Sequence, residues 1–180
     1  MTAVGADFPQ LLAAAQEGAE WAWTRIYHSV AAQLAGYARA KGAPEPEEVV
    51  GEVFHDVARN IGKFEGGESQ FRSWVFGIAH NRLVDQWRKQ QRRDNGQIQQ
   101  PQQSQSAEIS AIGSMLDGPA FAALESLTEQ QRSVLILRTV ADLSLDEVAD
   151  ALDMSVNAVK ALQHRAVNRL RKTLTKPVTK

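Results

Sequence analysis

Two runs of basic side chains are the residues in this sequence whose type and spacing could bind nucleic acid. Residues 160–180 carry seven Lys or Arg and no acidic residue. Residues 82–93 carry five Lys or Arg, with Asp85 as the single acid among them. Clustered cations neutralise phosphates and release counterions. Because the net charge of the whole chain is only −1, the local segregation of charge, and not its total, indicates such a partner, with a plain solvated helix face as the alternative.

The residues that catalysis or metal binding would require are few and dispersed. The four histidines stand in separate segments, without the H-E-x-x-H spacing of a zinc site: His28, His55, His80 and His164. Neither a P-loop nor a nucleophile elbow occurs. The chain has no cysteine, which excludes disulfides and cysteine-ligated zinc. We therefore expect a protein that is not an enzyme and that needs neither a cofactor nor a metal ion.

The elements that must position the basic runs are helices, because helical periodicity dominates and no alternating strand pattern is credible. Apolar stripes and turn signals predict helices over residues 8–17, 19–41, 46–61, 70–93, 129–140, 145–152 and 155–175. Gly42 suits the left-handed position after a helix end, and Pro46 suits the first turn of the next helix. Residues with capping chemistry mark the starts of the last three helices: Thr128 with Gln131, Ser144 with Glu147, and Ser155.

Apolar stripes predict which faces of these helices are buried. The stripe of the second helix comprises Trp23, Ile26, Tyr27, Val30, Leu34 and Tyr37. The stripe of the third comprises Val49, Val50, Val53, Phe54 and Val57. The stripe of the fourth comprises Phe71, Trp74, Val75, Ile78, Leu83 and Trp87. Together with the first helix, these stripes can close one core.

Composition divides the chain into three parts. Residues 94–118 contain six Gln, Pro101 and few large apolar side chains, so little burial could offset the entropy of ordering them. After them, two short helices, a tight turn and a basic last helix have the arrangement of a helix-turn-helix. We therefore predict an all-α fold with a four-helix domain over residues 1–93, a flexible linker over 94–118 and a helix-turn-helix domain over 119–180.

Particular stretches of both predicted domains resemble a known family. Residues 47–54, EEVVGEVF, and 71–88, FRSWVFGIAHNRLVDQWR, resemble region 2 of bacterial sigma factors. Residues 127–138, LTEQQRSVLILR, and 143–152, LSLDEVADAL, resemble region 4. The two regions in this order, without a region 3 domain between them, are typical of extracytoplasmic-function (ECF) sigma factors. The resemblance implies a transcription initiation factor that binds core RNA polymerase and promoter DNA.

The resemblance also implies which residues hold the melted −10 element. These residues are Lys63, Phe64, Arg72, His80, Asn81, Arg88 and Arg92. Cations suit phosphates, and an amide suits base edges. The loop over residues 63–70 would form the pocket for a flipped base, with Phe64 either as its stacking platform or as a small core residue under the loop.

In the last helix, the resemblance places five residues at the −35 element. They are Ser155, Lys160, Ala161, His164 and Arg165. The chain departs from the family pattern at Leu162 and Gln163, which leaves the position of the DNA-facing surface open by one residue. Leu162 would replace the usual packing side chain one position early.

The acidic residues of the third helix are expected to bind the polymerase. By the resemblance, Glu48, Glu52 and Asp56 would meet the clamp helices of the β′ subunit, and region 4 would meet the β flap. An ordinary solvated acidic face is the alternative. The family often has Gln where this chain has Gly51, so one contact would be missing. Control is expected to come from outside the chain, typically from an anti-sigma factor.

Two further expectations concern class and compartment. A helix-turn-helix regulator that does not bind core polymerase would explain the basic last helix, but not the basic, aromatic-rich fourth helix. The start of the chain lacks the basic and apolar segments of a secretory signal. No stretch approaches the roughly 20 apolar residues that span a bilayer. We therefore expect a cytoplasmic protein without membrane insertion.

Overall fold

The computed structural model describes residues 7–94, 123–124 and 126–174, with the side chains of residues 90–94 left aside. The helices in order are α1 (Phe8–Gln16), α2 (Glu20–Ala40), α3 (Pro46–Asn60), the short 3₁₀ helix η2 (Ile61–Lys63), α4 (Glu68–Asp94), α7 (Glu129–Thr139), α8 (Leu145–Ala151) and α9 (Val156–Leu174). No strand occurs in these residues. The predicted linker lies outside the described part, apart from Asp94, which ends α4.

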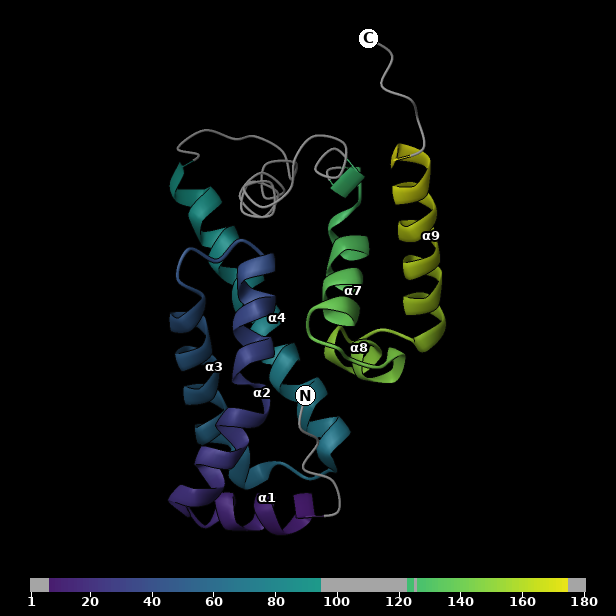
Figure 1. Ribbon diagram of the computed structural model, residues 1–180. Helices are drawn as coiled ribbons and strands as arrows, with labels where there is room; N and C mark the ends of the chain where they lie inside the picture. Colours follow the sequence, from purple (N-terminus) through teal and green to yellow (C-terminus); the bar gives the residue numbers. More distant parts are fainter. Residues whose placement is uncertain (1–6, 95–122, 125, 175–180) are drawn as a thin grey trace.

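The N-terminal unit, α1 to α4, surrounds one core. α2, α3 and α4 run side by side, and α1 crosses their lower end (Figure 1). Leu34, Val53 and Val75 are fully buried where the three long helices meet. Burying a side chain of this size contributes roughly 1.5–3 kcal/mol. The expected helix-end signals are present, since Gly42 has φ +81° after α2 and α3 begins at Pro46.

The C-terminal unit, α7 to α9, has the helix-turn-helix arrangement. Thr128 and Gln131 form a complete capping box at α7, and Ser144 and Glu147 form another at α8. The backbone N–H of Ala158 donates to the Ser155 hydroxyl at the start of α9, 3.2 Å away. The three predicted caps are therefore confirmed, and each satisfies amide groups that the first turn of a helix leaves unpaired.

The two units pack directly against each other. α8 lies across α4, and α7 lies beside α2 (Figure 1). Glycines permit the close approach, because a Cβ at Gly77 of α4 would lie 3.2 Å from the carbonyl oxygen of Ala151 in α8. A Cβ at Gly36 of α2 would lie 3.2 Å from Cγ1 of Val140, which follows α7. The sequence did not indicate this contact.

Tyr27 differs from its expected position in the core. Its side chain is 44% exposed, whereas Ile26, Val30 and Leu34 of the same helix are buried. A residue adjacent to Ile26 in a helix points about 100° away from it, toward the flank. There the ring of Tyr27 packs against the half-buried ring of Phe54, with centroids 4.9 Å apart. Neither aromatic side chain therefore lies fully in the core, although Phe54 contacts its edge.

Candidate nucleic-acid interface

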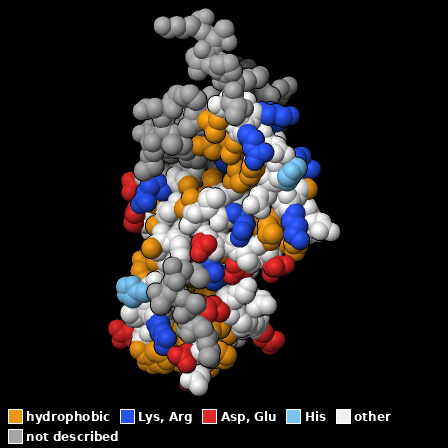
Figure 2. Space-filling model, turned by 45° about the vertical axis from the view of Figure 1, so that its right-hand side comes forward, with side chains coloured by type: hydrophobic (Ala, Val, Ile, Leu, Met, Phe, Trp, Pro, Cys, Tyr) orange, Lys and Arg blue, Asp and Glu red, His pale blue; other side chains and the backbone are white. Residues whose placement is uncertain are grey.

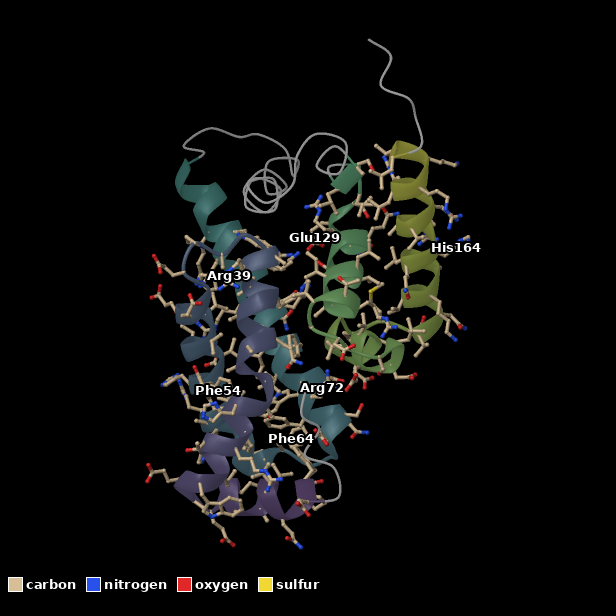
Figure 3. The ribbon with its side chains drawn as sticks, viewed as in Figure 1. Arg39, Phe54, Phe64, Arg72, Glu129 and His164 are labelled. Atoms are coloured by element: carbon tan, nitrogen blue, oxygen red, sulfur yellow. The ribbon has the colours of Figure 1, made fainter. Side chains whose placement is uncertain are left out.

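The predicted −35 residues form an outer face of α9. Lys160, His164 and Arg165 are exposed, and Ala161 between them is half-buried. The labelled His164 projects away from α7 and α8 (Figure 3). Figure 2, turned to bring the α9 side forward, shows several Lys and Arg side chains on the upper part of that side. This face can offer cations to phosphates and guanine edges.

Leu162 decides which side of α9 faces inward. Its side chain is 6% exposed and belongs to the core, together with Val159 and Ala166. Leu162 is therefore a packing side chain, and its register against the family pattern stays a prediction. Gln163 is half-buried beside it. Ser155 stands exposed at the N-terminus of the helix, where its hydroxyl accepts the capping bond.

Arg72 lies on α4 but is turned into the contact between the two units. Nη1 lies 3.3 Å from Oε1 of Glu147, and the two side chains are 10% and 6% exposed. Nη2 donates to the carbonyl oxygens of Ala141 and Asp142, at 3.3 and 3.0 Å. Figure 3 shows Arg72 at the junction of α4 with the C-terminal unit. In this arrangement the guanidinium is not presented to DNA.

His80 faces the same junction two turns further along α4. Its Nδ1 and the Tyr37 hydroxyl hydrogen-bond at 3.0 Å. Burial lowers the pKa of His80, and the nearby Lys41 ammonium lowers it further, while Glu129 opposes both. The ring is therefore neutral near pH 7 and acts as a hydrogen-bonding group.

The other predicted −10 residues of α4 lie on more open positions. Asn81 is exposed, as is Arg88, whose Nη1 lies 3.7 Å from Oδ1 of Asp85. The side chain of Arg92 lies outside the described part. The structure thus divides the predicted α4 face into a half covered by the C-terminal unit, with Arg72 and His80, and an open half, with Asn81 and Arg88.

The loop after η2 is anchored to the N-terminal unit. Lys63 is exposed, whereas the half-buried Phe64 stacks on Trp74, with centroids 5.0 Å apart and planes 21° apart. The side-chain amide of Gln16 donates to the carbonyl oxygens of Phe64 and Ile61, at 3.0 and 2.9 Å. One face of the Phe64 ring is thus already covered. This favours the core alternative over a freely accessible platform for a base.

The acidic face of α3 is partly neutralised by a residue that the sequence analysis did not single out for it. Arg82 of α4 donates to Glu52 at 2.9 Å and also to Asp56. Burial alone would lower the pKa of Arg82, but the bonds to Asp56 and Glu52 raise it. Glu48 is exposed on the same helix. The predicted stripe therefore consists of one open carboxylate and two that bind Arg82.

Lys41 is a second residue that the sequence did not reveal. Its side chain is fully buried at the contact between the units. Nζ donates to Oε1 of Glu129 and to the Ser133 hydroxyl, both at 2.9 Å, and lies 4.9 Å from the centroid of the Trp87 ring. A Lys at a helix end normally suggests only a favourable charge at the C-terminus. Its two hydrogen-bond partners lie more than 80 positions away, so no local signal could have found them.

Two further features are absent from the described part of the chain. Among those residues, no three His, Asp or Glu side chains gather as ligands of a metal ion. None of the described helices combines the length and the apolar character that crossing a bilayer requires.

Family models and related sequences that match this chain all belong to one group of proteins. Residues 22–93 match the model described as Sigma-70 region 2, and residues 123–172 match the model described as Sigma-70, region 4. Over 155 residues, the chain is 34% identical to the ECF RNA polymerase sigma factor SigX of Bacillus subtilis, covering 81% of this chain and 78% of that protein. It is 30% identical over 132 residues to the factor ShbA of Streptomyces griseus, covering 69% of each.

A longer relative and two solved structures extend the likeness. The chain is 28% identical over 171 residues to the ECF factor BldN of Streptomyces coelicolor, but spans only 65% of that protein's length. It resembles CnrH, solved in complex with the cytosolic domain of CnrY, with TM-score 0.70, 24% identity and coverage of 93% and 96% of the two chains. It also resembles RpoE of Bartonella quintana, solved with the anti-sigma factor NepR, with TM-score 0.62, 22% identity and coverage of 86% and 96%. The two structures support the all-helical fold.

Proposed function

This chain belongs to the ECF RNA polymerase sigma factors, and from that premise we propose that it binds core RNA polymerase and directs promoter-specific transcription initiation. The observation that carries the proposal is the pairing, in one chain, of a helix-turn-helix with a second long helix that exposes amide and cationic side chains, Asn81 and Arg88. The cationic outer face of α9 supplies the first, and α4 supplies the second. An ordinary helix-turn-helix regulator has no use for the region 2 unit.

The outer face of α9 reads the −35 duplex in this proposal. Lys160 and Arg165 contact phosphates or guanine edges, while Ala161 and His164 lie on the same face. Ser155 fixes the N-terminus of the helix, where backbone N–H groups favour phosphate. The burial of Leu162 supports this face, because a helix side that packs into the core cannot also enter the major groove.

The melted −10 strand lies along α4 in this proposal. Asn81 offers donors and an acceptor to base edges, and Arg88 and Arg92 contribute positive charge along the same helix. Lys63 and the loop after η2 lie at the start of α4, with Phe64 shaping the loop from beneath. Arg72 and His80 join this surface once the C-terminal unit no longer covers them.

The acidic face of α3 meets the polymerase in this proposal. Glu48, Glu52 and Asp56 face the basic clamp helices of the β′ subunit, with Arg82 holding the last two in place. Region 4, over residues 119–180, binds the β flap, and region 2 occupies residues 1–93. We place this activity in the cytoplasm, and an anti-sigma factor is a fitting external regulator.

Run-off transcription on a promoter library tests the function. Purified chain is added to core polymerase, and transcripts are sequenced. We expect chain-dependent transcripts whose start sites share a −10 and a −35 element. The Lys160→Ala/Arg165→Ala double variant should lose them while keeping its helical circular-dichroism spectrum. Sequence-specific DNA binding without any chain-dependent transcript would contradict the proposal and favour an ordinary regulator.

A further inference from the structure

The loop after η2 is held by a side chain that lies far from it in the sequence. Gln16 is the last residue of α1, and its side-chain amide carries two N–H groups. It donates to the carbonyl oxygens of Ile61 and Phe64, at 2.9 and 3.0 Å. The backbone N–H of Phe64 donates to the same Ile61 oxygen, at 3.0 Å. One amide therefore binds both ends of a single tight turn.

α1 is a firmly packed support for these two bonds. Phe8 and Leu11 are buried in the core of the N-terminal unit. The indole N–H of Trp23 in α2 donates to the carbonyl oxygen of Ala15, at 3.1 Å, directly beside Gln16. A helix of nine residues is too short to be stable alone, so this packing fixes its position. α1 also precedes the segment that matches region 2, which begins at residue 22.

Fixing Phe64 also fixes the backbone that follows it. Phe64 lies next to α1 at the lower end of the N-terminal unit (Figure 3). The chain folds back over its ring, because a Cβ added at Gly66 would lie 3.1 Å from Cζ of Phe64 and 3.0 Å from Cβ of Gln70. Gly66 has φ +153°, a conformation that favours glycine. A displacement of Phe64 would therefore displace the whole loop.

An ordered loop suits the recognition of a single base. Binding groups discriminate between ligands only when they are held within about 0.5 Å of the productive geometry. A loop that is ordered before binding also loses less conformational entropy on binding. Lys63, Glu65 and Ser69 are exposed around this loop, and they depend on its backbone for their positions.

We propose that Gln16 is a positioning residue for recognition of the −10 element: it presets the loop over residues 63–70, and the loop then discriminates between bases of the melted strand. This inference rests on the proposed −10 function of that loop. Gln16 acts through the backbone of Ile61 and Phe64. Its loss lowers the selectivity for the base that enters the loop, while −35 recognition by α9 stays unchanged.

Base selectivity of the holoenzyme tests the inference. The probes are fluorescein-labelled single-stranded oligonucleotides that carry the −10 element shared by the library transcripts, and the same oligonucleotides with each base replaced in turn. Fluorescence anisotropy with core and full-length chain gives the dissociation constants. Gln16→Met has a side chain of similar length without an N–H group. We expect the preference for the cognate base at one −10 position to fall about five- to tenfold, the usual net effect of losing one or two hydrogen bonds.

Two further variants separate positioning from a general loss of stability. Gln10→Met makes the same change at an exposed position of the same helix and should keep the wild-type preferences. Gln16→Arg has N–H groups that can donate to the same two carbonyl oxygens, so it should recover most of the lost preference. Binding of all three variants to a −35 duplex should equal that of the wild type.

The outcomes distinguish the inference from the proposed function. A wild-type preference that persists in Gln16→Met would overturn the role of Gln16 and leave the −10 function intact. Weaker binding of Gln16→Met to every oligonucleotide by the same factor, or no recovery in Gln16→Arg, would also overturn it, because the role would then be structural only. If the wild-type holoenzyme prefers no base at any −10 position, the proposed −10 function fails, and the role of Gln16 fails with it.

Discussion

The acidic face of α3 has two kinds of carboxylate: Glu48, which is exposed, and two that bind Arg82 of α4. Arg82 binds Glu52 and Asp56, whose side chains are 35% and 33% exposed. Reversing either charge would therefore break a contact between α3 and α4 as well as any contact with a partner. Glu48 is exposed. It is the member of the stripe whose substitution reports most directly on partner binding.

At Glu48, we predict that Glu48→Lys weakens binding to core polymerase about three- to tenfold, as expected for one charge at an interface rim. Fluorescence anisotropy of a labelled chain titrated with core measures the dissociation constant. The loss should shrink at higher salt, because exposed charges are screened. Glu17→Lys, an exposed acid at the end of α1, is the control and should bind normally. Equal affinities of Glu48→Lys and wild type would remove Glu48 from the interface.

At Lys160 and Arg165, substitution by Ala distinguishes two modes of contact with DNA. A bidentate base contact predicts a loss of about 1–3 kcal/mol on the preferred −35 duplex alone. A phosphate contact predicts weaker binding to every sequence and a salt slope reduced by about one. Lys172→Ala, in the last turn of α9, is the control. If neither residue affects binding to any duplex, α9 faces the DNA by another side.

At the scale of the elements, short-range chemistry made the helices predictable. The capping boxes of α7 and α8 and the glycine after α2 act within a few residues, so their sequence signals were sufficient. The position of Arg72 was not predictable in this way. Its partner Glu147 lies 75 positions away, and a cation on a helix facing DNA looks the same in sequence as a cation facing another helix.

For these elements, we predict that Thr128→Ala destabilises the protein by about 1 kcal/mol, the usual effect of removing an N-cap. Urea unfolding followed by circular dichroism measures the change. Thr173→Ala is the control, since its hydroxyl donates to the Arg169 carbonyl within α9 and such bonds do not stabilise a helix. A near-zero effect of Thr128→Ala would mean that the capping box does not contribute to the stability of α7.

At the scale of the whole molecule, the contact between the units could not have been read from either one alone. Gly36 and Gly77 are unremarkable in helical patterns, yet each marks a point where the other unit comes close. The domain boundaries, at residues 1–93 and 119–180, stay predictions. The predicted flexible linker between them, over 94–118, lies outside the described residues except at Asp94. The proposed DNA- and polymerase-binding roles also stay predictions.

The contact between the two units is predicted to depend on pH. Burial and Lys41 depress the pKa of His80, whose other neighbours at the contact are Tyr37 and Glu129. A histidine whose pKa is lowered in the contact supports that contact while the pH is above its ordinary pKa of 6.5. This support is lost as the pH falls below 6.5. The pKa of Glu129 is also lowered, because Lys41 and Ser133 outweigh the opposing effect of burial. Glu129 therefore stays ionised while His80 gains its proton.

Energy transfer between dyes on Arg59→Cys and Lys172→Cys measures whether the two units separate. Both positions are exposed, Arg59 in the last turn of α3 and Lys172 in the last turn of α9, so each unit carries one dye. We expect the transfer to change between pH 7.5 and about pH 5.5 as the units separate. His55→Gln, at an exposed histidine, should keep the pH response, and His80→Gln should abolish it. A response that survives in His80→Gln would assign the transition to another group.

This chain is expected to act as a subunit of the transcription machinery and not as an independent DNA-binding regulator. Size-exclusion chromatography of the chain mixed with core RNA polymerase tests it most directly. We predict stoichiometric co-elution with core in the absence of DNA, and sequence-specific promoter protection only by the complex. Elution of the chain apart from core, with promoter protection by the chain alone, would contradict the account.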